Sequence, residues 1–140
     1  MRFKLGVLLL MMVGLLSCGK GDTSGIPYVA VNFQGQLSDP NLSRLNSIGG
    51  SVVVNGYGVA GLVIFHNPSG GFAAYDRCSS YQPEKKCAVN IDPDLSSQAV
   101  DPCSGSKFAL TDGSPVKGPA SKSLRSYYVQ VVNNSIIVNN

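Results

Sequence analysis

The stretch DPCSGSKFAL (residues 101–110) does most to decide how this chain folds. Its proline, serine and glycine place Cys103 among residue types that favour a tight turn. The residues on either side of this turn predict short strands near residues 98–101 and 107–111. We therefore expect a cysteine-bearing turn between two neighbouring strands.

Short strands are also expected along the rest of the chain from Pro27 onward. The indications are runs of β-branched and aromatic residues, some with period-two alternation, separated by turns rich in glycine and asparagine. The expected strands are residues 28–35, 51–54, 61–65, 72–76, 126–132 and 135–139. Asn133 and Asn134 predict a tight hairpin turn between the last two, because asparagine tolerates positive φ.

The remaining segments fit the same fold class. Asp39 and Pro40 predict one helical turn whose two leucines face the core. A long polar loop is expected over residues 77–97, and an irregular segment over residues 112–122. With no amphipathic helix and no internal repeat, the 140 residues predict a single all-β domain, a sandwich or small barrel of short antiparallel strands.

The first residues predict export and a lipid anchor. Arg2 and Lys4 precede an apolar run, residues 5–16, that is too short to span a bilayer. The stretch LLSC (residues 15–18) then resembles a bacterial lipobox, in which the signal is cut before a cysteine that becomes acylated. An ordinary secretory signal with a chance cysteine is the alternative.

This interpretation divides the chain into a lipoprotein signal peptide (residues 1–17), a flexible tether lipidated at Cys18 (residues 18–26) and a β domain (residues 27–140). Loss of the signal lowers the formal charge from +3 to +1, because two of the 11 basic residues leave and all 8 acidic residues stay. Such a charge argues against nucleic-acid binding. The expected location is the bacterial cell envelope, on the exported side of a membrane, where disulfides persist.

The two cysteine-bearing loops resemble the two boxes of the Rieske iron–sulfur family. The second box of that family reads Cys-Pro-Cys-His-Gly-Ser-x-Phe, and residues 101–108 read Asp-Pro-Cys-Ser-Gly-Ser-Lys-Phe. A Gly-Pro-Ala segment at residues 118–120 and a Tyr-x-Val strand at residues 127–129 follow as in the family. The first box, Cys-x-His and a further cysteine, corresponds to residues 78–80 and Cys87.

This resemblance covers about residues 45–140. It implies a Rieske-like antiparallel β fold with a tip made of two loops, residues 77–97 and 101–122. It also implies a [2Fe–2S] cluster, which needs two cysteine and two histidine ligands. The ligand positions of the family correspond here to Cys78, Ser80, Asp101 and Ser104.

Only one of these four residues, Cys78, is a ligand of the family's type. The single histidine of the chain, His66, lies outside both boxes. We therefore expect no cluster and no metal, although Asp101 or Ser104 could supply oxygen ligands to an unusual iron site. A zinc site made by the three cysteines of the domain with Asp101 is a further alternative.

In many members of the family, the cysteines that do not bind iron join the two loops through a disulfide. The resemblance thus implies a Cys87–Cys103 disulfide, worth about 3 kcal/mol for a loop of this length. Pairing of Cys78 with either of them is the alternative. The thiol left over, expected at Cys78, is then either buried and inert or available for redox chemistry or intermolecular pairing.

The expected function is a membrane-anchored, non-catalytic binding or assembly module whose tip contacts an unidentified protein. No catalytic triad and no paired carboxylates at helical spacing are recognisable in the sequence. The residues expected at the contact are Tyr81, Lys85, Lys86, Ser104, Lys107 and Pro119. The alternatives are [2Fe–2S] electron transfer with non-standard ligands, and thiol–disulfide exchange in which Cys78 attacks the Cys87–Cys103 bond.

Overall fold

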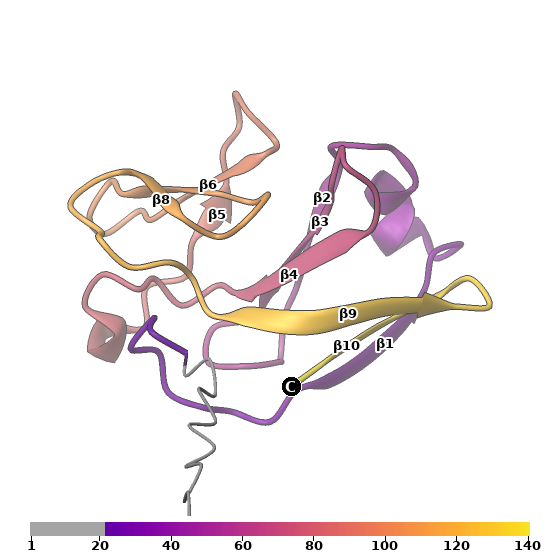
Figure 1. The fold of residues 1–140 in the computed structure, drawn as a ribbon, viewed down its shortest axis with the longest axis horizontal. Helices are drawn as coiled ribbons and strands as arrows, with labels where there is room; N and C mark the ends of the chain where they lie inside the picture. The colour runs from indigo at the N-terminus through magenta and orange to yellow at the C-terminus, as the bar shows by residue number, and fades with distance from the viewer. Residues whose placement is uncertain (1–21) are drawn as a thin grey trace, which may run out of the picture.

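The computed structural model describes residues 22–140, which form two antiparallel β-sheets (Figure 1). The all-β prediction is thereby confirmed. The expected signal peptide and Cys18 lie outside the described residues. Within residues 22–140, no helix has the length and apolar character needed to cross a membrane.

The base of the domain is a six-stranded sheet in the order β1-β10-β9-β4-β3-β2. Its strands are β1 (Asn32–Gln36), β2 (Ser51–Val54), β3 (Leu62–His66), β4 (Phe72–Asp76), β9 (Ser126–Val132) and β10 (Ser135–Asn139). The sheet curls, so that Phe33 on one edge strand and Val52 on the other belong to the same hydrophobic core. It therefore forms a half-barrel.

The tip is a four-stranded sheet inserted between β4 and β9, in the order β5-β6-β7-β8. Its strands are β5 (Asn90–Ile91), β6 (Gln98–Val100), β7 (Lys107–Ala109) and β8 (Pro115–Lys117), and a short 3₁₀ helix, η2 (Pro83–Lys85), precedes them. The expected loop over residues 77–97 thus contains η2 and β5. The expectation that residues 112–122 are irregular is wrong at β8, which is too short to leave a sequence pattern.

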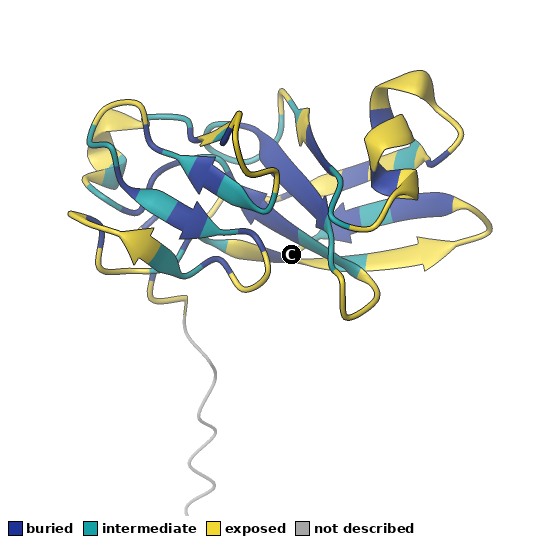
Figure 2. Cartoon of the chain, turned by 90° about the horizontal axis from the view of Figure 1, so that it is seen from above, coloured by how far each residue is buried: buried dark blue, intermediate teal, exposed yellow. Residues whose placement is uncertain are grey.

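Strand β3 explains how the two sheets are held together. Leu62 and Ile64 pack into the core of the base, whereas Val63 and Phe65 pack into a second core beneath the tip. All four side chains are at most 1% exposed, and Figure 2 shows buried residues running along the middle strands. A strand covered on both faces needs a continuous apolar run rather than an alternating one.

Local sequence signals account for the helix η1 (Pro40–Asn46) and for the last hairpin. The side chain of Asp39 accepts a hydrogen bond from the backbone N–H of Asn41, and the leucines of η1 are buried. Asn133 and Asn134 have φ of 48° and 62°, as the β9–β10 turn requires. Both predictions are confirmed.

The first strand starts later than predicted, at Asn32 instead of residue 28. Its partner β10 ends at Asn139, so residues 28–31 have no strand beside them. The side chain of Asn140 takes the place of a partner there. It accepts from the N–H of Val31 and donates to the carbonyl of Val29.

The described part of the expected tether, residues 22–26, is packed against the domain. Ser24 and Ile26 are 1% and 3% exposed. The guanidinium of Arg125 pairs with Asp22 at 2.7 Å and donates to the carbonyl of Ile26 at 2.9 Å. The packed domain therefore includes Asp22, rather than starting at Pro27, because Arg125 binds this segment.

Candidate functional site

The two predicted tip loops lie against each other and are each closed by backbone contacts. In the first loop, Cys78 and Ala88 form a β-bridge. In the second, the N–H of Asp101 donates to the carbonyl of Ser106 at 2.8 Å. Each loop therefore has a fixed base, which positions the side chains between them.

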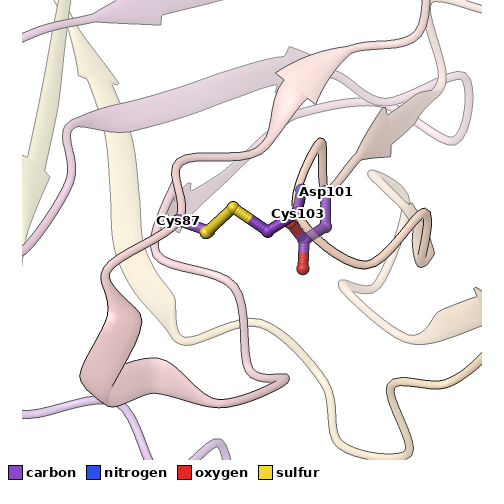
Figure 3. Close-up of side chains that lie close together, drawn as sticks. All are labelled: Cys87, Asp101 and Cys103. Carbon is purple, nitrogen blue, oxygen red and sulfur yellow. A yellow bond between two sulfur atoms is a disulfide. The ribbon is translucent and has the colours of Figure 1, made fainter.

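A disulfide between Cys87 and Cys103 joins the loops, as the resemblance implied (Figure 3). The two Cα atoms are 6.3 Å apart, within the usual range for a disulfide. The alternative pairings are wrong, since Cys78 is a free thiol with no exposed surface. The covalent link therefore lies between the two non-ligand positions of the family.

Asp101 lies beside this disulfide and is fully buried (Figure 3). Its Oδ2 accepts hydrogen bonds from the hydroxyls of Ser79 at 2.7 Å and Ser104 at 2.6 Å, and its Oδ1 accepts from the backbone N–H of Cys103 at 2.8 Å. Burial opposes ionisation, but these donors outweigh it and lower the pKa of Asp101. Hydrogen bonds thus stabilise the buried carboxylate of Asp101. Asp101 takes part in neither of the two ion pairs within residues 22–140.

The network continues from Ser104 into the third segment of the tip. The Oγ atoms of Ser104 and Ser106 are 2.8 Å apart. Because Ser104 donates its only hydroxyl proton to Asp101, Ser106 supplies the proton of this second bond. Ser106 Oγ in turn accepts from the backbone N–H of Ala120 at 2.9 Å. The segment that corresponds to the family's Gly-Pro-Ala loop is therefore tied to Asp101 through two serines.

Ser80 lies outside this network. Its hydroxyl donates to the carbonyl of Lys122 at 2.6 Å, and the residue is 7% exposed. The resemblance placed Ser80 and Ser104 at the two histidine positions of the family; in the structure both hydroxyls hydrogen-bond to other parts of the tip. These residues have a structural hydrogen-bonding role in this chain.

Cys78, at the remaining ligand position implied by the resemblance, is a buried free thiol. Burial, and secondarily the charge of Asp76, raises the pKa of Cys78 to about 11. Its Sγ lies 3.5 Å from the carbonyl oxygen of Pro83. A raised pKa makes this thiol a poor nucleophile at neutral pH, because the thiolate is the reactive form.

The side chains at the four ligand positions therefore do not fit a [2Fe–2S] cluster. One thiol is buried with a raised pKa, and the three oxygen side chains are engaged in hydrogen bonds with the protein. His66 is elsewhere, where its Nδ1 lies 2.8 Å from the carbonyl oxygen of Leu45 and its ring stacks on Phe72 at 4.5 Å. No described imidazole lies at the tip.

The structure brings together three of the four residues of the zinc alternative. Potential ligand atoms of Cys87, Asp101 and Cys103 lie within 4.8 Å of one another (Figure 3). The two sulfur atoms are bonded to each other, so they offer no thiolates. In this oxidised form, Asp101 alone could act as an ionised ligand.

The residues expected to contact a partner are not equally available. Lys85 and Lys86 are exposed on and beside η2, and Pro119 is exposed on the third segment. Tyr81 packs against the second core, and Lys107 forms a 2.7 Å ion pair with the buried Asp92. Tyr81 and Lys107 thus serve the packing of the tip.

Sequence reasoning missed Asp76, a second fully buried carboxyl group at the junction of base and tip. It accepts from the backbone N–H groups of Val59 (2.7 Å), Ala60 (3.1 Å) and Cys78 (2.8 Å), and from the hydroxyl of Tyr127 (2.7 Å). Burial and this hydrogen bond raise the pKa of Tyr127. The only signal in the sequence is an acidic residue at the end of an otherwise apolar strand.

Comparison with solved structures identifies similar folds. The cyanobacterial plasma membrane Rieske protein PetC3 from Synechocystis PCC 6803 has 27% sequence identity, with 81% of this chain and 100% of that chain covered at a TM-score of 0.54. The ferredoxin of carbazole 1,9a-dioxygenase from Nocardioides aromaticivorans IC177 has 16% identity, with 79% and 97% covered at a TM-score of 0.51. No family model matches the chain, and a search of curated proteins finds no match.

Proposed function

From the premise that this chain folds as a Rieske-type domain, we propose that it is a membrane-anchored lipoprotein that holds no iron–sulfur cluster. Its role is that of a non-catalytic binding or assembly module, with the tip as its contact surface. The expected partner is another protein of the cell envelope, since the charge of the mature chain, +1, gives no basis for binding nucleic acid.

The hydrogen-bonded network around Asp101 is the observation that carries this proposal. The family holds its cluster with thiolates and imidazoles. Here a carboxylate and a hydroxyl at two of those positions, Asp101 and Ser104, bind each other at 2.6 Å. Introducing a cluster would require these bonds to break and the buried thiol of Cys78 to ionise.

The rigidity of the tip supports binding as its role. The Cys87–Cys103 disulfide and the serine network tie three loop segments together, so little conformational freedom remains to be lost on association. Pro102, Cys103 and Pro119 are exposed on these loops. Loops fixed on a β scaffold are common contact surfaces.

Two observations support a location at a membrane. The LLSC stretch before Gly19 resembles a lipobox, with Cys18 as the acylated residue. The similar structure of PetC3 is described as a plasma membrane Rieske protein. Acylation of Cys18 would supply the attachment, because several acyl chains on one residue hold a protein stably on a bilayer, whereas a single chain does not.

Electron transfer is the second candidate function, favoured by the likeness to a Rieske protein and by Cys78 at a ligand position. It requires iron bound through oxygen ligands or through ligands from another chain. Thiol–disulfide exchange by Cys78 is not favoured, because burial raises the pKa of this thiol to about 11.

Site-specific photo-crosslinking in the native envelope tests the binding function. A photoreactive amino acid at Pro119 is expected to give a discrete crosslinked product. The same amino acid at Ser69, exposed in the β3–β4 turn, serves as the control and is expected to give none. Equal crosslinking from both positions, or none from Pro119, would contradict a contact role for the tip.

A further inference from the structure

The segment that leads to the predicted anchor is fixed on one side of the tip. Ser24 Oγ donates to the Asp22 carboxylate at 2.6 Å and accepts from the N–H of Ile26 at 3.1 Å. Gly25 lies between Lys122 and Pro83, since a Cβ atom placed on it would be 3.7 Å from Lys122 Nζ and 3.8 Å from Pro83 Cγ. Figure 1 shows the described chain beginning beside η2.

The distance from this segment to the anchor is short. Three residues separate Cys18 from Asp22, so even a fully extended chain covers at most about 14 Å between their Cα atoms. Acyl chains on Cys18 would therefore hold Asp22 close to the lipid headgroups. This step rests on the proposed lipidation of Cys18.

Three lysines belong to the segments that meet Gly25: Lys122 contacts it, and Lys85 and Lys86 follow Pro83 in the chain. Lys85, Lys86 and Lys122 are exposed, and none takes part in either of the ion pairs within residues 22–140. Of the nearby acidic residues, Asp22 is paired with Arg125. Glu84 on η2 and Asp112, which lines a pocket with Asp22 and Ser24, are exposed and take part in neither ion pair of the described chain. Lysines at a bilayer surface are attracted to anionic headgroups.

We propose that the surface formed by Gly25, Pro83, Lys85, Lys86 and Lys122, the anchor-side surface, lies on an anionic bilayer. The lysines contact headgroup phosphates, and the docked segment fixes the orientation of the domain. This assigns Lys85 and Lys86 to lipid contact and leaves the exposed loop residues Pro102 and Pro119 for a protein partner.

Fluorescence quenching on vesicles tests this orientation. The full chain, exported and processed in a bacterial host, is labelled at Ser121→Cys beside Lys122, or at Ser69→Cys as the control. Ser69 is a suitable control because it lies at the other end of β4 from the docked segment. Asp76 ends β4 and its N–H donates to the carbonyl of Arg125, whereas the β3–β4 turn that carries Ser69 lies roughly 17 Å away along the strand. The vesicles contain phosphatidylcholine with or without phosphatidylglycerol, plus a lipid with a nitroxide headgroup as quencher.

Stronger quenching at position 121 than at position 69 is expected, and phosphatidylglycerol should increase the difference. Lys85→Gln with Lys86→Gln should lower the ratio of docked to undocked protein on anionic vesicles by roughly fivefold per lysine. Lys117→Gln, which removes an exposed charge on β8, should change it little. Equal quenching at both positions, or no effect of the double substitution, would overturn the proposal.

Vesicle flotation separates this inference from the anchor itself. If Cys18 is acylated, Cys18→Ala should abolish flotation with phosphatidylcholine vesicles. If flotation persists, the proposed acylation of Cys18 is wrong. The quenching measurement is then repeated with a histidine tag in place of Cys18, on vesicles that contain a chelator lipid. The same quenching pattern there would support the anchor-side surface, and its absence would overturn it.

Discussion

The two carboxyl groups with no exposed surface in residues 22–140, Asp76 and Asp101, are held by different kinds of donor. Both are 0% exposed, and neither takes part in an ion pair of the described chain. Asp76 accepts three hydrogen bonds from backbone N–H groups and one from a phenol. Those backbone donors are set by the path of the chain, so the Asp76 site is part of the fold.

Asp101 depends more on side chains. Two of its donors are the hydroxyls of Ser79 and Ser104. None of the donors to Asp76 is a side chain at positions 78, 80, 101 or 104, so the junction does not depend on the side chains at those positions. The centre of the tip, in contrast, is stabilised by the side chains of Asp101, Ser79 and Ser104.

Asp76→Ala should have the largest effect. It leaves a phenol and three backbone N–H groups without their acceptor, in a place closed to water, and we expect a loss of about 3–5 kcal/mol in the free energy of unfolding. Urea unfolding measures it, with Asp94→Asn at an exposed position as the control. A loss smaller than that of Asp101→Asn would contradict the conclusion that Asp76 supports the whole fold and Asp101 mainly the tip.

Removal of the disulfide should come next. Cys87→Ala with Cys103→Ala should lower the free energy of unfolding by about 3 kcal/mol, because the unfolded chain is no longer constrained. A reductant should lower the stability of the wild type by a similar amount and leave the double variant unchanged. If the reductant affects both proteins equally, the stabilisation does not come from this bond.

Asp101→Asn should destabilise the domain by about 2 kcal/mol, since it replaces charge-assisted hydrogen bonds with neutral ones. Hydrogen exchange should show the loss of protection in the tip, at Cys103 and Gly105, while β3 keeps its protection. Uniform loss of protection across both sheets would mean that Asp101 supports the whole domain, as Asp76 does.

The pH dependence of the unfolding free energy tests whether Asp101 is ionised in the folded protein. Its pKa is lowered in the folded state, so the stability that it contributes is present above the pKa of an unfolded aspartate, about 3.9, and is lost as the pH falls through the lower folded value. The difference in unfolding free energy between the wild type and Asp101→Asn should therefore shrink on acidification. A difference that is constant with pH would contradict an ionised Asp101.

Ser104→Ala should have the smallest effect, about 1 kcal/mol, because Ser104 is only partly buried and water can replace its hydroxyl. Ser121→Ala, at an exposed position, is the matched control and should be neutral. Thermal unfolding of both variants measures the difference. A cost for Ser104→Ala above that of Asp101→Asn would contradict Asp101 as the centre of the network.

The sequence predicted the structure correctly where a short motif favours one local conformation. Asp39 with Pro40 predicted η1, and two consecutive asparagines predicted the last hairpin. The late start of β1 and the existence of β8 were not predictable, because both depend on which strand runs alongside. The packing of residues 22–26 depends on Arg125, about a hundred residues away.

Sequence reasoning identified the main residues of the candidate site but did not predict the hydrogen bonds between them. The family's spacing located Cys87, Cys103 and Asp101 and implied the disulfide. Nothing in that spacing assigns Ser79 as a donor to Asp101, since Ser79 falls between two ligand positions. Asp76 was missed because its backbone donors come from residues 59, 60 and 78, which only the folded chain brings together.

The decisive measurement is the iron and acid-labile sulfide content of the protein, together with its visible spectrum. The protein is purified without oxygen from its export compartment. We expect near-zero iron and sulfide and a colourless protein, because Ser80, Asp101 and Ser104 are engaged in hydrogen bonds within the tip. About two irons and two sulfides per chain, with the absorbance of a [2Fe–2S] cluster, would contradict it.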